Sequence, residues 1–61
     1  MKPEELKRRR EALGLTQEQL ARALDVAVMT ISRWERGVNP IPHYIGLALE
    51  AIEARHRRVA A

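Results

Sequence analysis

The fold is decided by residues 16–37, which read TQEQLARALDVAVMTISRWERG. Thr16 and Gln19 have the spacing of a capping box, in which each side chain bonds the backbone N–H of the other residue. Leu15 and Leu20 have the spacing of a hydrophobic staple around the same helix start. The sequence therefore predicts two short helices joined by a tight turn, over residues 17–25 and 28–36.

Two further helices flank this pair. Before it, Pro3 suits the first position of a helix, and Glu4 and Glu5 suit the positive end of the helix dipole. After it, apolar residues recur at helical spacing, as Ile45, Ala48, Leu49 and Ile52. We expect these helices over residues 3–13 and 42–58, with Leu6, Arg10 and Leu13 on the inward side of the first. The predicted fold is an all-α, compact four-helix domain, with a five-helix version as the alternative.

Composition excludes several classes of protein and site. The chain has 11 Lys and Arg against 8 Asp and Glu, and the net charge of +3 suits a polyanionic partner. Cysteine is absent, which excludes disulfides and thiolate metal sites and fits a reducing cytoplasm. No apolar run is long enough for a membrane span or a signal peptide. His43 and His56 stand far apart and neither is paired with a nucleophile, so we expect no enzyme, no metal and no cofactor.

Residues 16–37 resemble the helix-turn-helix of the Cro and phage-repressor family, also called lambda-repressor-like domains. Leu20, Ile31 and Trp34 match buried positions of the family, and Ala21 matches the small residue that lets the two helices approach. The full set of matching residues is Thr16-Gln17-Glu18-Gln19-Leu20-Ala21, Leu24, Val26 and Thr30-Ile31-Ser32-Arg33-Trp34-Glu35-Arg36-Gly37. Domains of this family have four or five helices, so the likeness in fold covers nearly the whole chain. It implies a single domain over residues 1–61.

The chain departs from the family pattern at two positions. Asp25 stands where the family usually has Gly in the turn, and Asp tolerates the left-handed conformation better than most residues. Ala27 stands where Ser or Thr often caps the second helix of the motif, which should cost about 1 kcal/mol. We expect the fold to survive both changes.

The resemblance implies a transcriptional repressor or regulator that binds double-stranded DNA with residues 28–36 in the major groove. The expected base contacts are Val28, Met29, Ser32 and Arg33, and the expected backbone contacts are Arg10, Thr16, Gln17, Arg36, Asn39 and His43. Arg33 suits a guanine edge, with a phosphate as the alternative, and Val28 and Met29 suit thymine methyl groups, with a protein contact as the alternative. The resemblance also implies a bacterial or phage regulator associated with the nucleoid.

Arg10 is a cation on the core-facing side of its helix and needs a partner. The resemblance implies that Glu35 is this partner and that Arg10 also reaches a DNA phosphate; the alternative is that Arg10 extends to water. We expect Arg8 and Arg9 to form a solvated face with Glu4 and Glu5. Glu50 and Glu53 form no convincing acid–base pair and are expected to solvate the last helix.

The last helix carries a second apolar stripe, formed by Tyr44, Leu47, Ala51 and Ala54 and extended by Val38 and Ile41. A surface helix needs only one such stripe, so we expect a homodimer on a palindromic operator. The two copies either associate in solution or associate only on DNA. The alternative is that Tyr44 and Leu47 widen the core of the monomer.

Two other functions compete with DNA binding. A protein-interaction module on the same fold, such as an antitoxin or an accessory regulator, would use the apolar stretch from Ala27 to Met29. Membrane binding by the last helix is a less favoured hypothesis, because the apolar side of that helix faces the core. We expect no small-molecule effector, since 61 residues leave no room for a ligand-binding domain.

Overall fold

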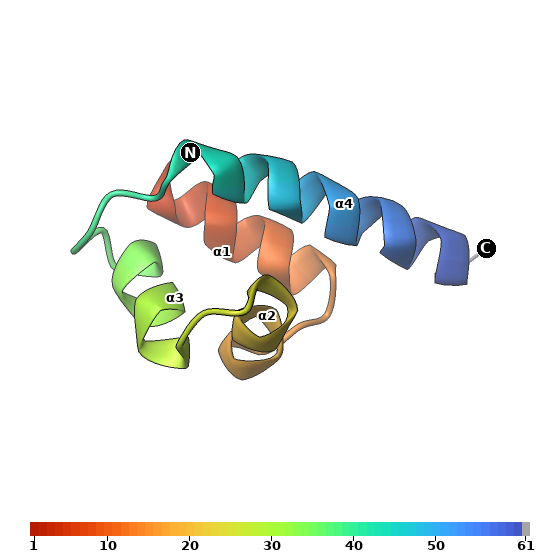
Figure 1. Cartoon of the computed structure of the whole chain (residues 1–61), viewed down its shortest axis with the longest axis horizontal. Coiled ribbons are helices and arrows are strands. Elements are labelled where there is room, and N and C mark those ends of the chain that lie inside the picture. Colours follow the sequence, from red (N-terminus) through yellow and green to blue (C-terminus); the bar gives the residue numbers. More distant parts are fainter. Residues whose placement is uncertain (61) are drawn as a thin grey trace.

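The computed structural model describes residues 1–60, which form four helices and no strand (Figure 1). The helices are α1 (Pro3–Ala12), α2 (Gln17–Leu24), α3 (Val28–Glu35) and α4 (His43–Ala60). The prediction of an all-α, four-helix domain is confirmed, and no fifth helix occurs within residues 1–60. Leu13, Asp25 and Arg36, which we expected inside helices, are instead the C-caps of α1, α2 and α3.

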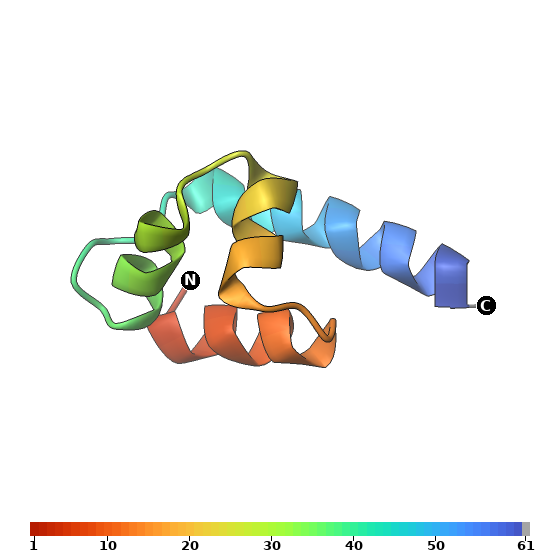
Figure 2. The same cartoon turned by 90° about the horizontal axis from the view of Figure 1, so that it is seen from below.

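α1 and α4 run in the same general direction, α2 crosses from α1 to α4, and α3 lies at one end of the molecule (Figure 2). The last turns of α4 project beyond the other helices, and the molecule measures 36 × 19 × 18 Å (Figure 1). The fully buried residues come one from each helix, and they are Leu6, Leu20, Ile31 and Leu49. Because the two short middle helices are packed into this shared core, they need no intrinsic stability of their own.

Local chemistry fixes the ends of α2. The Thr16 hydroxyl accepts a hydrogen bond from the Gln19 backbone N–H at 3.1 Å, and the Gln19 side-chain oxygen accepts one from the Thr16 N–H at 2.9 Å. The predicted capping box is therefore confirmed. At the other end Asp25 has a φ of 58°, so the turn into α3 uses the left-handed conformation without glycine. Ala27 is the N-cap of α3 and has no side-chain oxygen to bond the helix start.

The core differs from the prediction at two apolar residues. Leu13 is only half-buried after the end of α1, and Leu15 in the next loop packs against the core. Ile41 also packs against the core, so it does not extend the outer stripe of α4 as we expected.

Within the described residues, no helix is long and apolar enough to cross a membrane.

An ion pair between Arg9 and Glu53 joins α1 to α4. Arg9 Nε lies 2.9 Å from Glu53 Oε2, and Arg9 Nη2 lies 2.7 Å from Glu53 Oε1. These hydrogen bonds hold the pKa of Glu53 below its usual value. We expected Arg9 to lie on a solvated face with Glu5 and expected Glu53 to solvate α4; the pair between Arg9 and Glu53 corrects both expectations. Within α1, Arg9 Nη1 also lies 3.5 Å from Glu5 Oε2.

Candidate nucleic-acid interface

One side of α3 is free of the protein core. Ile31 and Trp34 are buried, whereas Val28 and Met29 are 43% and 54% exposed. Residues four apart on a helix share a face, so Val28, Ser32 and Arg36 form one row and Met29 and Arg33 form the next. The four residues named as base contacts therefore lie together on this outer face of α3.

The C-terminal half of this face is polar. Arg33 and Arg36 are exposed, and Ser32 is half-buried. Arg36 donates from Nε to the Ser32 hydroxyl at 3.2 Å, which leaves the hydroxyl hydrogen and the terminal guanidinium groups of Arg36 for other partners. Arg33 adds a second exposed cation on the adjacent row.

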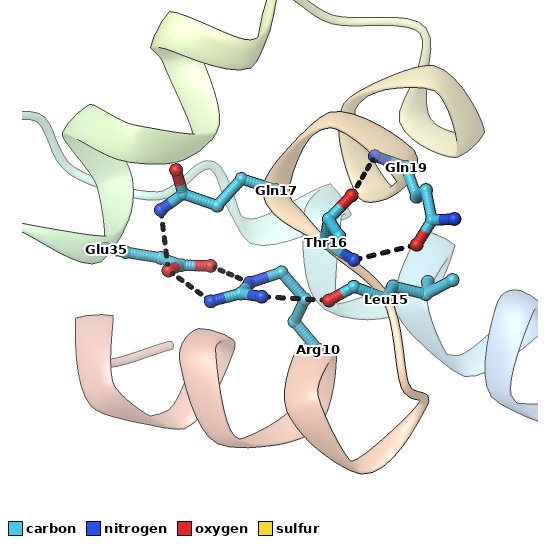
Figure 3. A network of polar contacts seen from close by, with 6 residues as sticks. All are labelled: Arg10, Leu15, Thr16, Gln17, Gln19 and Glu35. Atoms are coloured by element: carbon cyan, nitrogen blue, oxygen red, sulfur yellow. Dashed lines mark hydrogen bonds and ion pairs between the residues drawn. The ribbon is translucent and has the colours of Figure 1, made fainter.

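A partly buried polar network joins α1, α2 and α3 (Figure 3). Arg10 donates to Glu35 from Nε at 2.7 Å and from Nη2 at 3.1 Å, and its Nη1 donates to the Leu15 carbonyl at 2.8 Å. Gln17 donates from Nε2 to Glu35 Oε1 at 3.1 Å. The structure thus pairs Arg10 with Glu35, as the resemblance implied. It also brings Gln17 into the same cluster, and the sequence did not indicate this third member.

The Arg10–Glu35 pair is shielded from water. The Arg10 and Glu35 side chains are 11% and 4% exposed. Burial raises the pKa of Glu35, but the hydrogen bonds from Arg10 and Gln17 and the charge of Arg10 outweigh burial and leave the pKa lowered. The hydrogen bond to Glu35 raises the pKa of Arg10. Both side chains are therefore charged at neutral pH, and each fixes the position of the other.

The N-terminus of α2 lies beside this network. Thr16 is exposed, and its hydroxyl accepts from Gln19, so the hydroxyl hydrogen remains available to another acceptor. Gln17 uses one of its two amide hydrogens on Glu35 and keeps the other. The first backbone N–H groups of a helix have no partner within the helix and favour anions. Thr16, Gln17 and Arg10 therefore form one group of donors adjoining α3.

The remaining two candidate backbone contacts stand apart from this group. Asn39 is exposed in the loop between α3 and α4. His43 begins α4 and lines a shallow hollow with Glu5, Arg9 and Glu50, on the side of the molecule formed by α1 and α4. Neither residue joins the network around Glu35.

The outer stripe of α4 faces solvent. Tyr44 and Leu47 are 63% and 62% exposed, and Ala51 is also exposed. The alternative that Tyr44 and Leu47 widen the monomer core is therefore wrong. Ala54 is half-buried and contributes less to this surface.

Among residues 1–60, no three His, Asp or Glu side chains lie close enough to hold a metal ion. The comparison with protein families returns one described as helix-turn-helix, whose model matches residues 6–52 and so most of the chain. Neither a curated protein nor a solved structure matches the sequence. The matched range contains α2, α3 and the network around Glu35.

Proposed function

Because the chain belongs to the helix-turn-helix family of Cro and phage-repressor type, we propose that it represses transcription by binding specific sequences of double-stranded DNA. The family as a whole consists of DNA-binding regulators. In the proposed complex α3 lies in the major groove and α2 crosses the DNA backbone. Such a regulator acts in the cytoplasm of a bacterium, beside the nucleoid.

The observation that carries this proposal is the juxtaposition of a free helix face with a group of donors. The outer face of α3 ends in Arg33 and Arg36, and the Gln17–Glu35 hydrogen bond holds the N-terminus of α2 next to α3. A face that reads bases needs this second surface, because contacts to phosphates fix the orientation of a protein on the duplex. Arg33 reads a guanine through O6 and N7 in this complex, and Ser32 adds a hydroxyl donor.

The backbone contacts in the proposed complex come from Thr16, Gln17 and Arg10 on one side and from Arg36 and Asn39 on the other. Arg10 has two N–H groups left after its bonds to Glu35 and Leu15, so it can bond a phosphate without leaving Glu35. His43 is placed less favourably than the others, because it lies in the hollow with Arg9 and Glu50.

We also propose that two copies bind a palindromic operator through the outer stripe of α4. Tyr44, Leu47 and Ala51 expose apolar surface that the monomer does not use. Tyr44 and Ala51 also line a shallow apolar groove with Leu24 and Ile52, between α2 and α4. A second copy would bury this surface and double the number of base pairs read.

A mobility-shift titration against a random duplex pool at low salt, followed by selection of the bound sequences, tests the proposal. We expect binding whose logarithm of affinity falls linearly with the logarithm of salt concentration, as phosphate contacts require, and a selected consensus sequence. Absence of binding at low salt would contradict DNA binding. Binding without any selected consensus would contradict sequence specificity.

A protein-interaction module is the second candidate, and the exposure of Val28 and Met29 favours it. Exposed apolar side chains on adjoining positions also suit a partner protein, as in an antitoxin or an accessory regulator. The same titration separates the two candidates, because a pure protein-binding module would not retard duplex DNA at low salt.

A further inference from the structure

The exposed face of α3 divides into two halves of different chemistry. Its N-terminal turn presents Val28 and Met29 next to the N-cap Ala27, so no side chain there donates or accepts a conventional hydrogen bond. Ser32 and Arg33 follow one turn later and carry the polar groups. Val28 and Met29 are 43% and 54% exposed, because the core-facing side of α3 is formed by Ile31 and Trp34 instead.

The apolar half is the half that reaches deepest into DNA in the proposed complex. In a docked helix-turn-helix, the N-terminal residues of the recognition helix contact the base edges. Base edges in the major groove offer hydrogen-bond donors, acceptors and one apolar group, the C5 methyl of thymine. An aliphatic side chain against a donor or acceptor removes water without replacing the lost hydrogen bond, which is unfavourable. The methyl group is therefore the feature of a base edge that Val28 and Met29 fit.

We propose that Val28 and Met29 read the C5 methyl group of pyrimidines, and that at these positions the protein accepts 5-methylcytosine in place of thymine. The inference rests on the proposed DNA binding and adds the chemical class of the group recognised. 5-Methylcytosine carries its methyl group on the same ring atom as thymine. The two bases differ at their exocyclic group, a donor in one and an acceptor in the other, which an aliphatic side chain does not distinguish.

The charges around this turn favour DNA over a protein as its partner. Arg33 stands one turn beyond Met29, and Arg36 stands one turn beyond Ser32. A guanidinium there can bond a neighbouring guanine or a phosphate while the apolar turn contacts the methyl groups. An apolar contact flanked by two exposed cations thus complements a polyanion that carries methyl groups on its base edges.

The test uses the duplex that the protein selects from a random pool. Each thymine is replaced in turn by deoxyuridine, which removes one methyl group and keeps the adenine partner. At each sensitive position, a cytosine–guanine pair is then compared with a 5-methylcytosine–guanine pair. We expect deoxyuridine to weaken binding about four-fold at one or two positions, and cytosine methylation at those positions to strengthen binding by about the same factor.

Two variants identify the side chains that read the methyl group. Val28→Ala and Met29→Ala should bring the thymine-to-uracil affinity ratio close to one, each at the position that its side chain contacts. The control is Glu4→Ala, since Glu4 is exposed on α1 and belongs to none of the proposed DNA or dimer contacts; it should leave the ratio unchanged.

The possible failures are distinguishable. A selected duplex whose binding ignores every methyl substitution would overturn the inference and leave DNA binding intact. Failure to bind any duplex would overturn the proposed function and this inference with it.

Discussion

Two side chains at the interface, Arg33 and Gln17, are expected to act in different ways on DNA. Arg33 extends from the outer face of α3, where its guanidinium can bond both acceptors of a guanine. Arg33→Ala should therefore weaken binding to the selected duplex by about 1–3 kcal/mol and relax the preference at one guanine. Gln17 is expected to contact the DNA backbone, so Gln17→Ala should weaken binding to all duplexes alike. Mobility-shift titrations on the selected duplex and on single-base variants measure both effects. An equal loss on all duplexes for Arg33→Ala would make Arg33 a phosphate contact.

Glu35 accepts the hydrogen bonds of both Arg10 and Gln17 in the network. Glu35→Ala leaves the Arg10 guanidinium, only 11% exposed, without its partner, and should lower the free energy of unfolding by about 3 kcal/mol. Glu53→Ala is the matched control, because the Arg9 and Glu53 side chains are 21% and 24% exposed and their separation should cost about 1 kcal/mol or less. Urea unfolding midpoints measure the difference. Equal losses for the two variants would mean that burial of the Arg10–Glu35 pair has no energetic consequence.

The stability supplied by Glu35 should also depend on pH. Its pKa is lowered in the folded state, so the unfolded chain takes up the proton first as the pH falls. The contribution is therefore complete above the ordinary glutamate pKa of about 4.3 and is lost as the pH falls through the lower folded value. Glu35→Gln removes the charge at every pH. The gap in stability between the wild type and Glu35→Gln should be largest at neutral pH and should close as the pH falls through the lowered folded pKa of Glu35. A gap that stays constant with pH would contradict the lowered pKa.

At the scale of the elements, the start of α3 lacks both a side-chain cap and an acidic residue in its first turn. Its N-cap is Ala27, which has an extended backbone suited to a capping residue but no oxygen to accept the first N–H groups. Ala27→Ser should supply that acceptor and raise the free energy of unfolding by about 1 kcal/mol, as measured by urea unfolding. Ala23→Ser, inside α2 and also exposed, is the control and should lower stability by a few tenths of a kcal/mol through helix propensity. If both variants lower stability, the cap of α3 is not the weak point.

Elements whose signals are local were predictable from the sequence, and contacts between distant elements were not. The capping box of α2 depends on residues three apart, and it is present as predicted. The Arg9–Glu53 pair joins residues 44 apart and depends on how α1 lies against α4, which no spacing rule specifies. Arg10–Glu35 also spans two elements, and only the family resemblance pointed to it. Leu13 was assigned to the core because α1 was expected to end one residue later than it does.

At the scale of the whole molecule, the difficulty is that one such domain reads few base pairs. A single small module buries a limited area on DNA and gains little specificity over the many competing sites of a genome. The outer stripe of α4 offers a solution, because a two-fold axis brings the same surface of two copies together. If that stripe forms the contact, the two α3 helices should lie about 34 Å apart, one turn of DNA.

The stoichiometry on DNA tests this arrangement. We expect native mass spectrometry and sedimentation to find two chains on a palindromic duplex with two half-sites one turn apart, and cooperative binding in titrations. Leu47 is 62% exposed on the outer stripe. Leu47→Arg should abolish the cooperativity, because the two-fold axis would bring the new positive charges of the two copies together. Added positive charge does not repel DNA, so binding to a single half-site should persist. Ala12→Arg adds the same charge at an exposed position on α1 and should leave the cooperativity unchanged. A strict one-to-one complex without cooperativity in the wild type would rule out the dimer and leave α3 of a single chain to carry all of the specificity.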